Sequence, residues 1–68
     1  MSKKLRSPED MEPGRNYIFV YKTAKARKYQ YEGRFLRIQV YEGSLWYMFD
    51  SGTPYEHASI LSVREAEL

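Results

Sequence analysis

The feature that most constrains the fold is the segment Tyr29–Val40, which alternates like a β-strand but contains an internal glycine. Every second position of its latter half is apolar, at Leu36, Ile38 and Val40. A period of two marks one buried and one solvated face. Gly33 lies inside the pattern, where glycine commonly marks a bulge or a bend. We therefore predict one long strand that bends at Gly33, buries these three apolar residues and turns the corner of a small barrel.

Aromatic and β-branched residues, which favour strands, fill four further segments. These predicted strands are 17–21, 45–49, 55–58 and 60–64. Turn-forming residues separate them at Glu42-Gly43-Ser44, at Asp50–Pro54 and near Ser59. No helical pattern lies between the strands, which argues against a βαβ plan. The sequence predicts an all-β fold, a small, strongly bent antiparallel barrel of five strands.

The barrel is expected to occupy one domain, residues 16–64. Residues 1–15 are predicted to form a flexible N-terminal arm, with at most one helical turn where Ser7 caps Pro8 and two acidic residues follow. Residues 65–68 are predicted to be a frayed tail.

The composition excludes several kinds of chemical site. The chain has 68 residues, no cysteine and one histidine, His57. Disulfides and thiolate metal sites are excluded, no carboxylates are spaced for a metal, and no nucleophile elbow or phosphate-binding glycine loop is present. We expect no cofactor and no enzymatic activity. A domain this small then depends on packing or association for its stability.

Membrane insertion is not expected. No apolar run approaches the roughly 20 residues of a membrane span. Residues 1–10 lack the apolar core of a signal peptide. Together with the absence of cysteine, this predicts a cytoplasmic protein with no membrane partner.

Two segments carry a family resemblance. Tyr55-Glu56-His57-Ala58, followed by the short hydrophobic strand Ile60–Val63, is similar to the second Sm motif of the bacterial Sm-like RNA chaperones of the Hfq family. Glu56 stands where that family has lysine. The segment 31–35, with its glycine before a hydrophobic run, resembles the family's bent second strand. The resemblance implies an Sm-like or SH3-like barrel, and it extends to RNA binding through His57.

Basic and aromatic residues gather around one predicted loop. Four cations fall within seven residues, at Lys22, Lys25, Arg27 and Lys28. Tyr29 and Tyr31 follow them, offering rings for base stacking beside charge for phosphates. Arg34 and Arg37 on the adjoining strand could extend a basic face. A mobile N-terminal arm could extend it further with Lys3, Lys4 and Arg6. The alternative is a solvated loop that keeps a small barrel soluble.

The strand 45–49 has two apolar faces. Leu45, Tyr47 and Phe49 share one face, and Trp46 and Met48 share the other. If the first face supplies the core, Trp46 and Met48 form an exposed patch for a ligand or a protein partner. If the faces are reversed, these roles exchange.

Three functions remain open. The first is a nucleic-acid-binding barrel that uses the basic loop and neighbouring tyrosines. The second is a protein-interaction module, for example a phage or mobile-element factor that docks on a host protein through its aromatic face. The third is an assembly subunit whose strand edges form a homo-oligomer.

Overall fold

The computed structural model describes residues 3–66 of the chain. Its strands are β1 (Asn16–Lys22), β2 (Lys28–Tyr41), β3 (Ser44–Phe49), β4 (Pro54–Glu56) and β5 (Ile60–Glu65). Two short 3-10 helices, η1 (Pro8–Asp10) and η2 (His57–Ser59), complete the regular structure. The predicted all-β class with five strands is confirmed.

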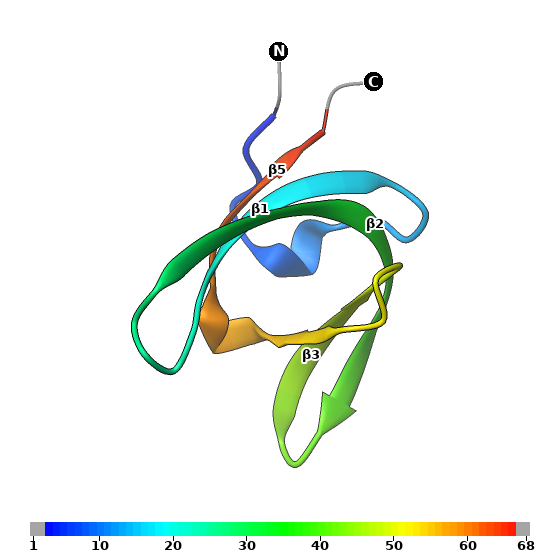
Figure 1. Cartoon of the computed structure of the whole chain (residues 1–68). Helices are drawn as coiled ribbons and strands as arrows, with labels where there is room; N and C mark the ends of the chain where they lie inside the picture. The colour runs from blue at the N-terminus through cyan, green and yellow to red at the C-terminus, as the bar shows by residue number, and fades with distance from the viewer. Residues whose placement is uncertain (1–2, 67–68) are drawn as a thin grey trace.

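The strands form one antiparallel sheet in the order β4-β3-β2-β1-β5, and β2 belongs to both of its halves. β2 pairs with β1 as far as Arg34, which lies opposite Asn16. From Phe35, opposite Phe49, it pairs with β3 instead. Figure 1 shows β2 as a strongly curved ribbon that reaches across the molecule. Gly33 lies just before the change of partner, so the glycine stands where the sequence predicts the bend.

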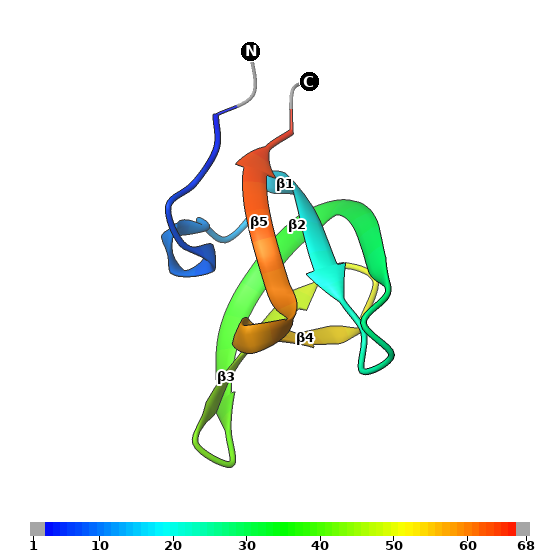
Figure 2. The same cartoon turned by 90° about the vertical axis from the view of Figure 1, so that its left-hand side faces the viewer.

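The predicted burial of the latter half of β2 is wrong. The exposed fractions are 38% for Leu36, 40% for Ile38 and 67% for Val40. The buried residue is instead Phe35. The pairing register shifts between Phe35 and Arg37, so a β-bulge interrupts the alternation there. Beyond the bulge, β2 has no further buried residue, and the hairpin that it forms with β3 projects from the body in Figures 1 and 2. At the base of this hairpin, β3 still buries Tyr47 and pairs with β4 from Trp46 to Met48. We call this hairpin, residues 36–48, the arm.

Aromatic rings dominate the core. Its buried members are Met11, Tyr17, Phe19, Phe35, Tyr47, Phe49, Ile60 and Val63. Phe19 and Phe49 stack at its centre with their ring centroids 4.5 Å apart. β1 contributes Tyr17 and Phe19 to the core, and β3 contributes Tyr47 and Phe49. Of the two alternatives left open for the strand 45–49, the structure therefore has the one in which the face of Tyr47 and Phe49 supplies the core.

The N-terminal segment is packed, in contrast to the flexible structure predicted for residues 1–15. Ser7 caps η1 by accepting a hydrogen bond from the Glu9 N–H (3.2 Å). Met11, immediately after η1, is 5% exposed and part of the core. The Leu5 N–H donates to the Val63 carbonyl (2.9 Å), which ties the segment to β5. Apolar burial and strand pairing therefore hold residues 3–15. The rest of the N-terminal segment predicted to be flexible, residues 1–2, lies outside the described residues.

The C-terminal boundary also differs slightly from the prediction. Glu65 is the last residue of β5, and the Ala66 N–H donates to the Asn16 carbonyl (3.1 Å). The rest of the predicted tail, residues 67–68, lies outside the described residues.

Candidate nucleic-acid interface

The four clustered cations lie at the end of the β1–β2 hairpin, which we call the basic tip (residues 22–28). Lys22 and Lys28 are directly opposite each other, where β1 ends and β2 begins. Lys25 and Arg27 occupy the turn, and the Thr23 N–H closes it by donating to the Arg27 carbonyl (2.9 Å). All four cationic residues are exposed. Within residues 3–66, none of them forms an ion pair with a carboxylate, so their charge is available to an anionic partner.

The same hairpin continues as a basic surface on the outside of the sheet. Side chains directly opposite each other in a sheet share a face, and Lys22 and Lys28 share theirs with alternate residues along both strands. The register of β5, β1 and the first half of β2 therefore defines an outer face, whose outward residues are Asn16, Ile18, Val20, Lys22, Lys28, Gln30, Glu32, Arg34, Ser62 and Arg64. Four of these residues are cations, and one, Glu32, is a carboxylate.

Lys4 adds a further cation to the outer face. It forms a β-bridge with Arg64, outside the edge of β5. Lys4 and Arg64 also line a shallow depression of about 380 Å³ together with Val20 and Gln30. Because Val20 is the outward residue next to Lys22 on β1, this depression lies between the basic tip and the Lys4–Arg64 end of the face.

The tyrosines of the hairpin point to its opposite, inward face. Tyr21 and Tyr29 are paired across the strands and their rings stack, with centroids 5.8 Å apart. Tyr21 in turn packs against Tyr55 (4.8 Å), and Tyr55 packs against Phe19 in the core (4.9 Å). A ladder of rings thus leads from the core to Tyr29, which is 45% exposed beside the basic tip. Burial, with a smaller contribution from Tyr21, raises the pKa of Tyr55 to about 12.

Tyr31 has a structural position. It is half-buried, its ring lies 5.4 Å from Phe19, and its hydroxyl donates to the Asp50 carboxylate (3.4 Å). The same carboxylate oxygen accepts a hydrogen bond from the Arg34 backbone N–H (3.3 Å). Tyr31 therefore helps to fasten β2 to the end of β3, and Tyr29 is the better placed of the two for stacking on a base.

The structure separates the two arginines of β2. Arg34 lies on the outer face, about 20 Å along the strand from Lys28 at about 3.3 Å per residue, with Glu32 between them. Arg37 lies beyond the bulge on the arm, opposite Met48. Arg34 therefore belongs to the outer face, and Arg37 belongs to a different surface.

Trp46 lies on the outward side of β3. It is half-buried and lines a mainly apolar depression of about 250 Å³ with Tyr41, Met48 and Pro54. Among the described residues, its Nε1 is a buried nitrogen without a hydrogen-bond partner. Trp46 and Met48 thus form part of a patch on the arm, remote from the outer face in the order of the sheet.

His57 is exposed at the start of η2, and its Nδ1 lies 2.8 Å from the Tyr47 hydroxyl. Burial and, to a lesser extent, the charge of Glu9 raise the pKa of Tyr47 to about 12. The pair links η2 to the core. This hydrogen bond gives His57 a structural role that the resemblance does not predict.

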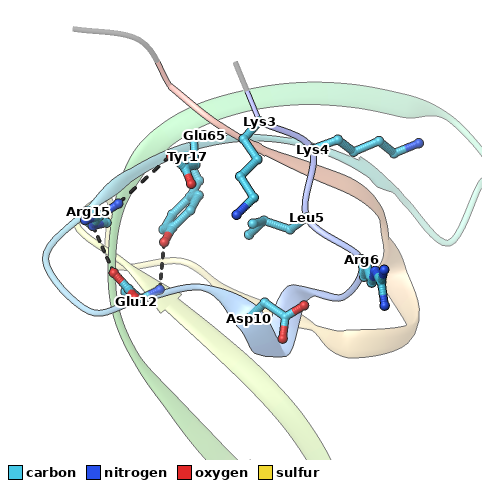
Figure 3. A pocket seen from close by; sticks show the side chains of 9 residues that line it. All are labelled: Lys3, Lys4, Leu5, Arg6, Asp10, Glu12, Arg15, Tyr17 and Glu65. Atoms are coloured by element: carbon cyan, nitrogen blue, oxygen red, sulfur yellow. Dashed lines mark hydrogen bonds and ion pairs between the residues drawn. The ribbon is translucent and has the colours of Figure 1, made fainter. Parts of the chain in front are cut away.

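A third concave region lies under the N-terminal segment (Figure 3). It has a volume of about 380 Å³ and is lined by both cations and carboxylates. Figure 3 shows Lys3 extending into the space between β1 and η1, and Lys4 extending away from it. Arg15 pairs with Glu12 (2.9 Å) and more distantly with Glu65 (4.0 Å), and the Glu12 N–H donates to the Tyr17 hydroxyl (2.7 Å). Because the charges here compensate one another, this region suits an anion less well than the outer face.

Sequence reasoning missed Arg64 as a part of the basic surface. Arg64 alternates with the buried Val63, a signal that places it outward on β5. Lys4 was expected to extend the basic face from a mobile N-terminal segment, and it joins the outer face through its β-bridge to Arg64 of β5.

Residues 3–66 contain no cluster of three or more histidine or carboxylate side chains placed to hold a metal ion. They also contain no helix whose length and apolarity would carry it across a bilayer.

Comparisons with known proteins add no relative. No protein-family model, no curated protein and no solved structure matches this chain.

Proposed function

We propose that the protein binds the backbone of a nucleic acid along its outer face and basic tip. The observation that carries this proposal is the charge of the outer face, four cations to one carboxylate, which is continuous with the exposed Lys25 and Arg27 of the tip. Cations arranged in this way neutralise phosphates and release condensed counterions, which is the main source of non-specific affinity for nucleic acids.

Tyr29 favours a single-stranded ligand. Its partly exposed ring lies beside the basic tip, and a base that stacks on it would sit within reach of the cations that hold the neighbouring phosphates. Stacking tolerates every base, so the binding is expected to have little sequence preference. If four phosphates are contacted, the logarithm of affinity should fall against the logarithm of salt with a slope of about −3 for a single strand.

The test is a charge reversal with a matched control. The variant K25E/R27E/K28E changes the net charge by the same amount as R6E/R15E/R37E, whose arginines are exposed but lie off the outer face and the tip. Fluorescence anisotropy with a labelled oligothymidine across a salt series should show binding abolished in the first variant and largely kept in the second. Equal losses in both would mean that net charge, rather than this surface, drives binding. Circular dichroism checks that both variants fold.

A second candidate function is supported by the arm. An apolar depression lies where the projecting hairpin meets β4, and its lining includes Trp46, Met48, Tyr41 and Pro54. An exposed apolar surface of this kind suits a protein partner. A phage or mobile-element factor acting on a host protein is one form of this proposal. Trp46→Ala should then remove a captured partner and leave nucleic-acid binding intact.

The remaining proposals concern family and location. The sharing of one long bent strand between two halves of the sheet supports an SH3-like or Sm-like barrel. A cytoplasmic location is consistent with a nucleic-acid ligand, and fractionation of cells that express the tagged protein would test it.

A further inference from the structure

The edge of β2 along the arm is open to another strand. The first half of β2 is covered by β1, and the backbone of Phe35 is bonded to Gly14 and Arg15 (2.8 and 2.9 Å). From Leu36 to Tyr41, β2 pairs with β3 on one side, and no strand among residues 3–66 pairs with it on the other. We propose that this edge pairs antiparallel with the same edge of a second copy of the chain, joining two molecules through their arms.

The turn of the arm determines which backbone groups face the open edge. Glu42 and Gly43 both have positive φ, 49° and 78°, as in a two-residue type I′ turn. Tyr41 and Ser44 then form the hydrogen-bonded pair that closes the hairpin, and the pairs alternate along the strands. Ile38 and Val40 fall in the pairs that are not hydrogen-bonded to β3. Their N–H and C=O groups therefore point outward and can bond another strand.

The side chains of the open edge are unusually apolar for an exposed strand. Leu36, Ile38, Val40 and Tyr41 are all exposed, by 38 to 67%. Proteins commonly protect such an edge with lysine, proline or a covering segment. The edge of β5 is protected in this way, because Leu5 N–H donates to Val63 and Glu65 N–H donates to the Lys3 carbonyl (2.7 Å). The arm has no corresponding cover within the described residues, and it projects clear of the body (Figure 2).

A second copy suits this edge because the strand is complementary to itself. In a two-fold antiparallel pair centred on Gln39, Ile38 lies opposite the other copy's Val40, and both belong to the outward-bonding set. The same register brings Arg37 opposite the other copy's Tyr41, a pairing of cation and aromatic ring. Apolar residues thus meet apolar residues on one face and no like charges are opposed. Association also adds apolar burial to a domain whose core, among the described residues, has eight buried members.

The dimer is expected to be weak. A pair of short strands buries less than the roughly 1,200 Å² of a stable interface, so we expect a monomer–dimer equilibrium in the micromolar range. Sedimentation equilibrium over about 5 to 500 μM should show the mass rise from 8.1 kDa toward twice that value. A monomer throughout this range, or a larger ring, would overturn the proposal.

Two variants and a control localise the contact. Val40→Lys places a charge on the open edge and should weaken association by at least about 10-fold. Val40→Pro should do the same by removing an outward N–H, a position at which an edge strand tolerates proline. Leu61→Lys is the control, because Leu61 is an apolar residue of β5 with 47% exposure. Equal weakening by Val40→Lys and Leu61→Lys would contradict the proposal.

Amide hydrogen exchange distinguishes this edge from any other contact. Protection of the Ile38 and Val40 amides should rise with protein concentration, whereas the Gln39 and Tyr41 amides, bonded to β3, should change little. Dimers that leave the Ile38 and Val40 amides unprotected would overturn the proposal. Concentration-independent protection that appears only when another protein is added would instead assign the edge to a different partner. Because these measurements need no nucleic acid, their outcome is independent of the proposed binding function.

Discussion

The two hairpins that share β2 are built alike but end differently. Both are antiparallel, and both use a tight turn with a non-glycine residue at positive φ, Ala26 in one and Glu42 in the other. The β1–β2 hairpin lies over the aromatic core along most of its length, and its end carries four exposed cations. In the arm, β2 has no buried residue beyond Phe35, and the end of the arm carries exposed apolar residues.

Within β2, therefore, apolar residues and buried residues do not coincide. In the first half of β2, the inward Tyr31 and Gly33 face a filled interior. In the second half, apolar residues continue although the core has ended at Phe35. Apolar side chains that contribute little burial to the monomer are available for association, whereas a charged hairpin end resists strand pairing and attracts anions. The predictions below test this division, beginning with the largest effect.

Phe19→Ala should destabilise the protein far more than Val40→Ala does. Phe19 is fully buried and stacks on Phe49, so its truncation should cost about 3–5 kcal/mol, comparable to the whole stability of a domain this small. Val40 is 67% exposed on the arm, so its truncation should cost less than about 0.5 kcal/mol. Urea unfolding at low protein concentration measures both. Similar losses of stability would show that Val40 contributes as much to folding as the core does, and would contradict this division of the molecule.

Gly33→Ala tests the bend that joins the two hairpins. A Cβ atom at this position would clash with the Tyr31 ring and lie 2.9 Å from an Asp50 carboxylate oxygen. We expect a loss of about 1–3 kcal/mol, because the ring and the Asp50 hydrogen bonds must shift. Gln30→Ala, an exposed position on the same strand, is the control for thermal unfolding. A Gly33→Ala variant as stable as this control would mean that the bend does not depend on the glycine.

Much of the body of the molecule could be predicted because its signals are local. Aromatic and β-branched residues mark β1 and β3, and alternation places Tyr47 and Phe49 together on the face that was one of two candidates for the interior and is buried in the structure. Glycine marks the region of the bend in β2 for the same reason. The basic tip is likewise visible because its cations are adjacent in the sequence.

The errors arise where the outcome depends on distant residues. Alternation cannot show where a core ends, and it does not reveal a bulge, so Leu36, Ile38 and Val40 are exposed against the prediction. Met11 is a single apolar residue in a polar segment and has no period to report its burial. The position of Lys4 beside the outer face depends on its bridge to β5, which pairs opposite ends of the chain and leaves no local signal in the sequence.

The core should also respond to alkaline pH. Burial favours the neutral phenols of Tyr47 and Tyr55 and raises the pKa of each to about 12, above the ordinary value of 10.0. The folded state therefore binds more protons than the unfolded state between these values. The stability they provide is full below pH 10 and is lost as pH rises through about 12.

The measurement for this effect is the free energy of unfolding as a function of pH. Tyr47 is fully buried, so its share of the alkaline loss should be of the order of 1–2 kcal/mol. Tyr47→Phe should lose stability near neutral pH, through its hydrogen bond to His57, but should show a shallower alkaline decline. A decline as steep as that of the wild type would mean that Tyr47 does not carry the effect.

The smallest effects are expected at the turns of the two hairpins, and they distinguish the β1–β2 hairpin from the arm most directly. Ala26 has φ 61° in the basic tip and Glu42 has φ 49° in the arm, a conformation that glycine and asparagine adopt at lower cost. Ala26→Gly and Glu42→Asn should each stabilise the monomer by about 0.5–1 kcal/mol in urea unfolding.

Their effects on self-association should differ. Glu42→Asn orders the arm in the hairpin geometry that a second copy would pair with, so it should strengthen dimerisation in sedimentation equilibrium. Ala26→Gly acts on the other hairpin and should leave the dimerisation constant unchanged. If both substitutions shift dimerisation equally, general stability controls it rather than the order of the arm. If neither shifts it although both stabilise the monomer, the arm is already fully ordered before it pairs.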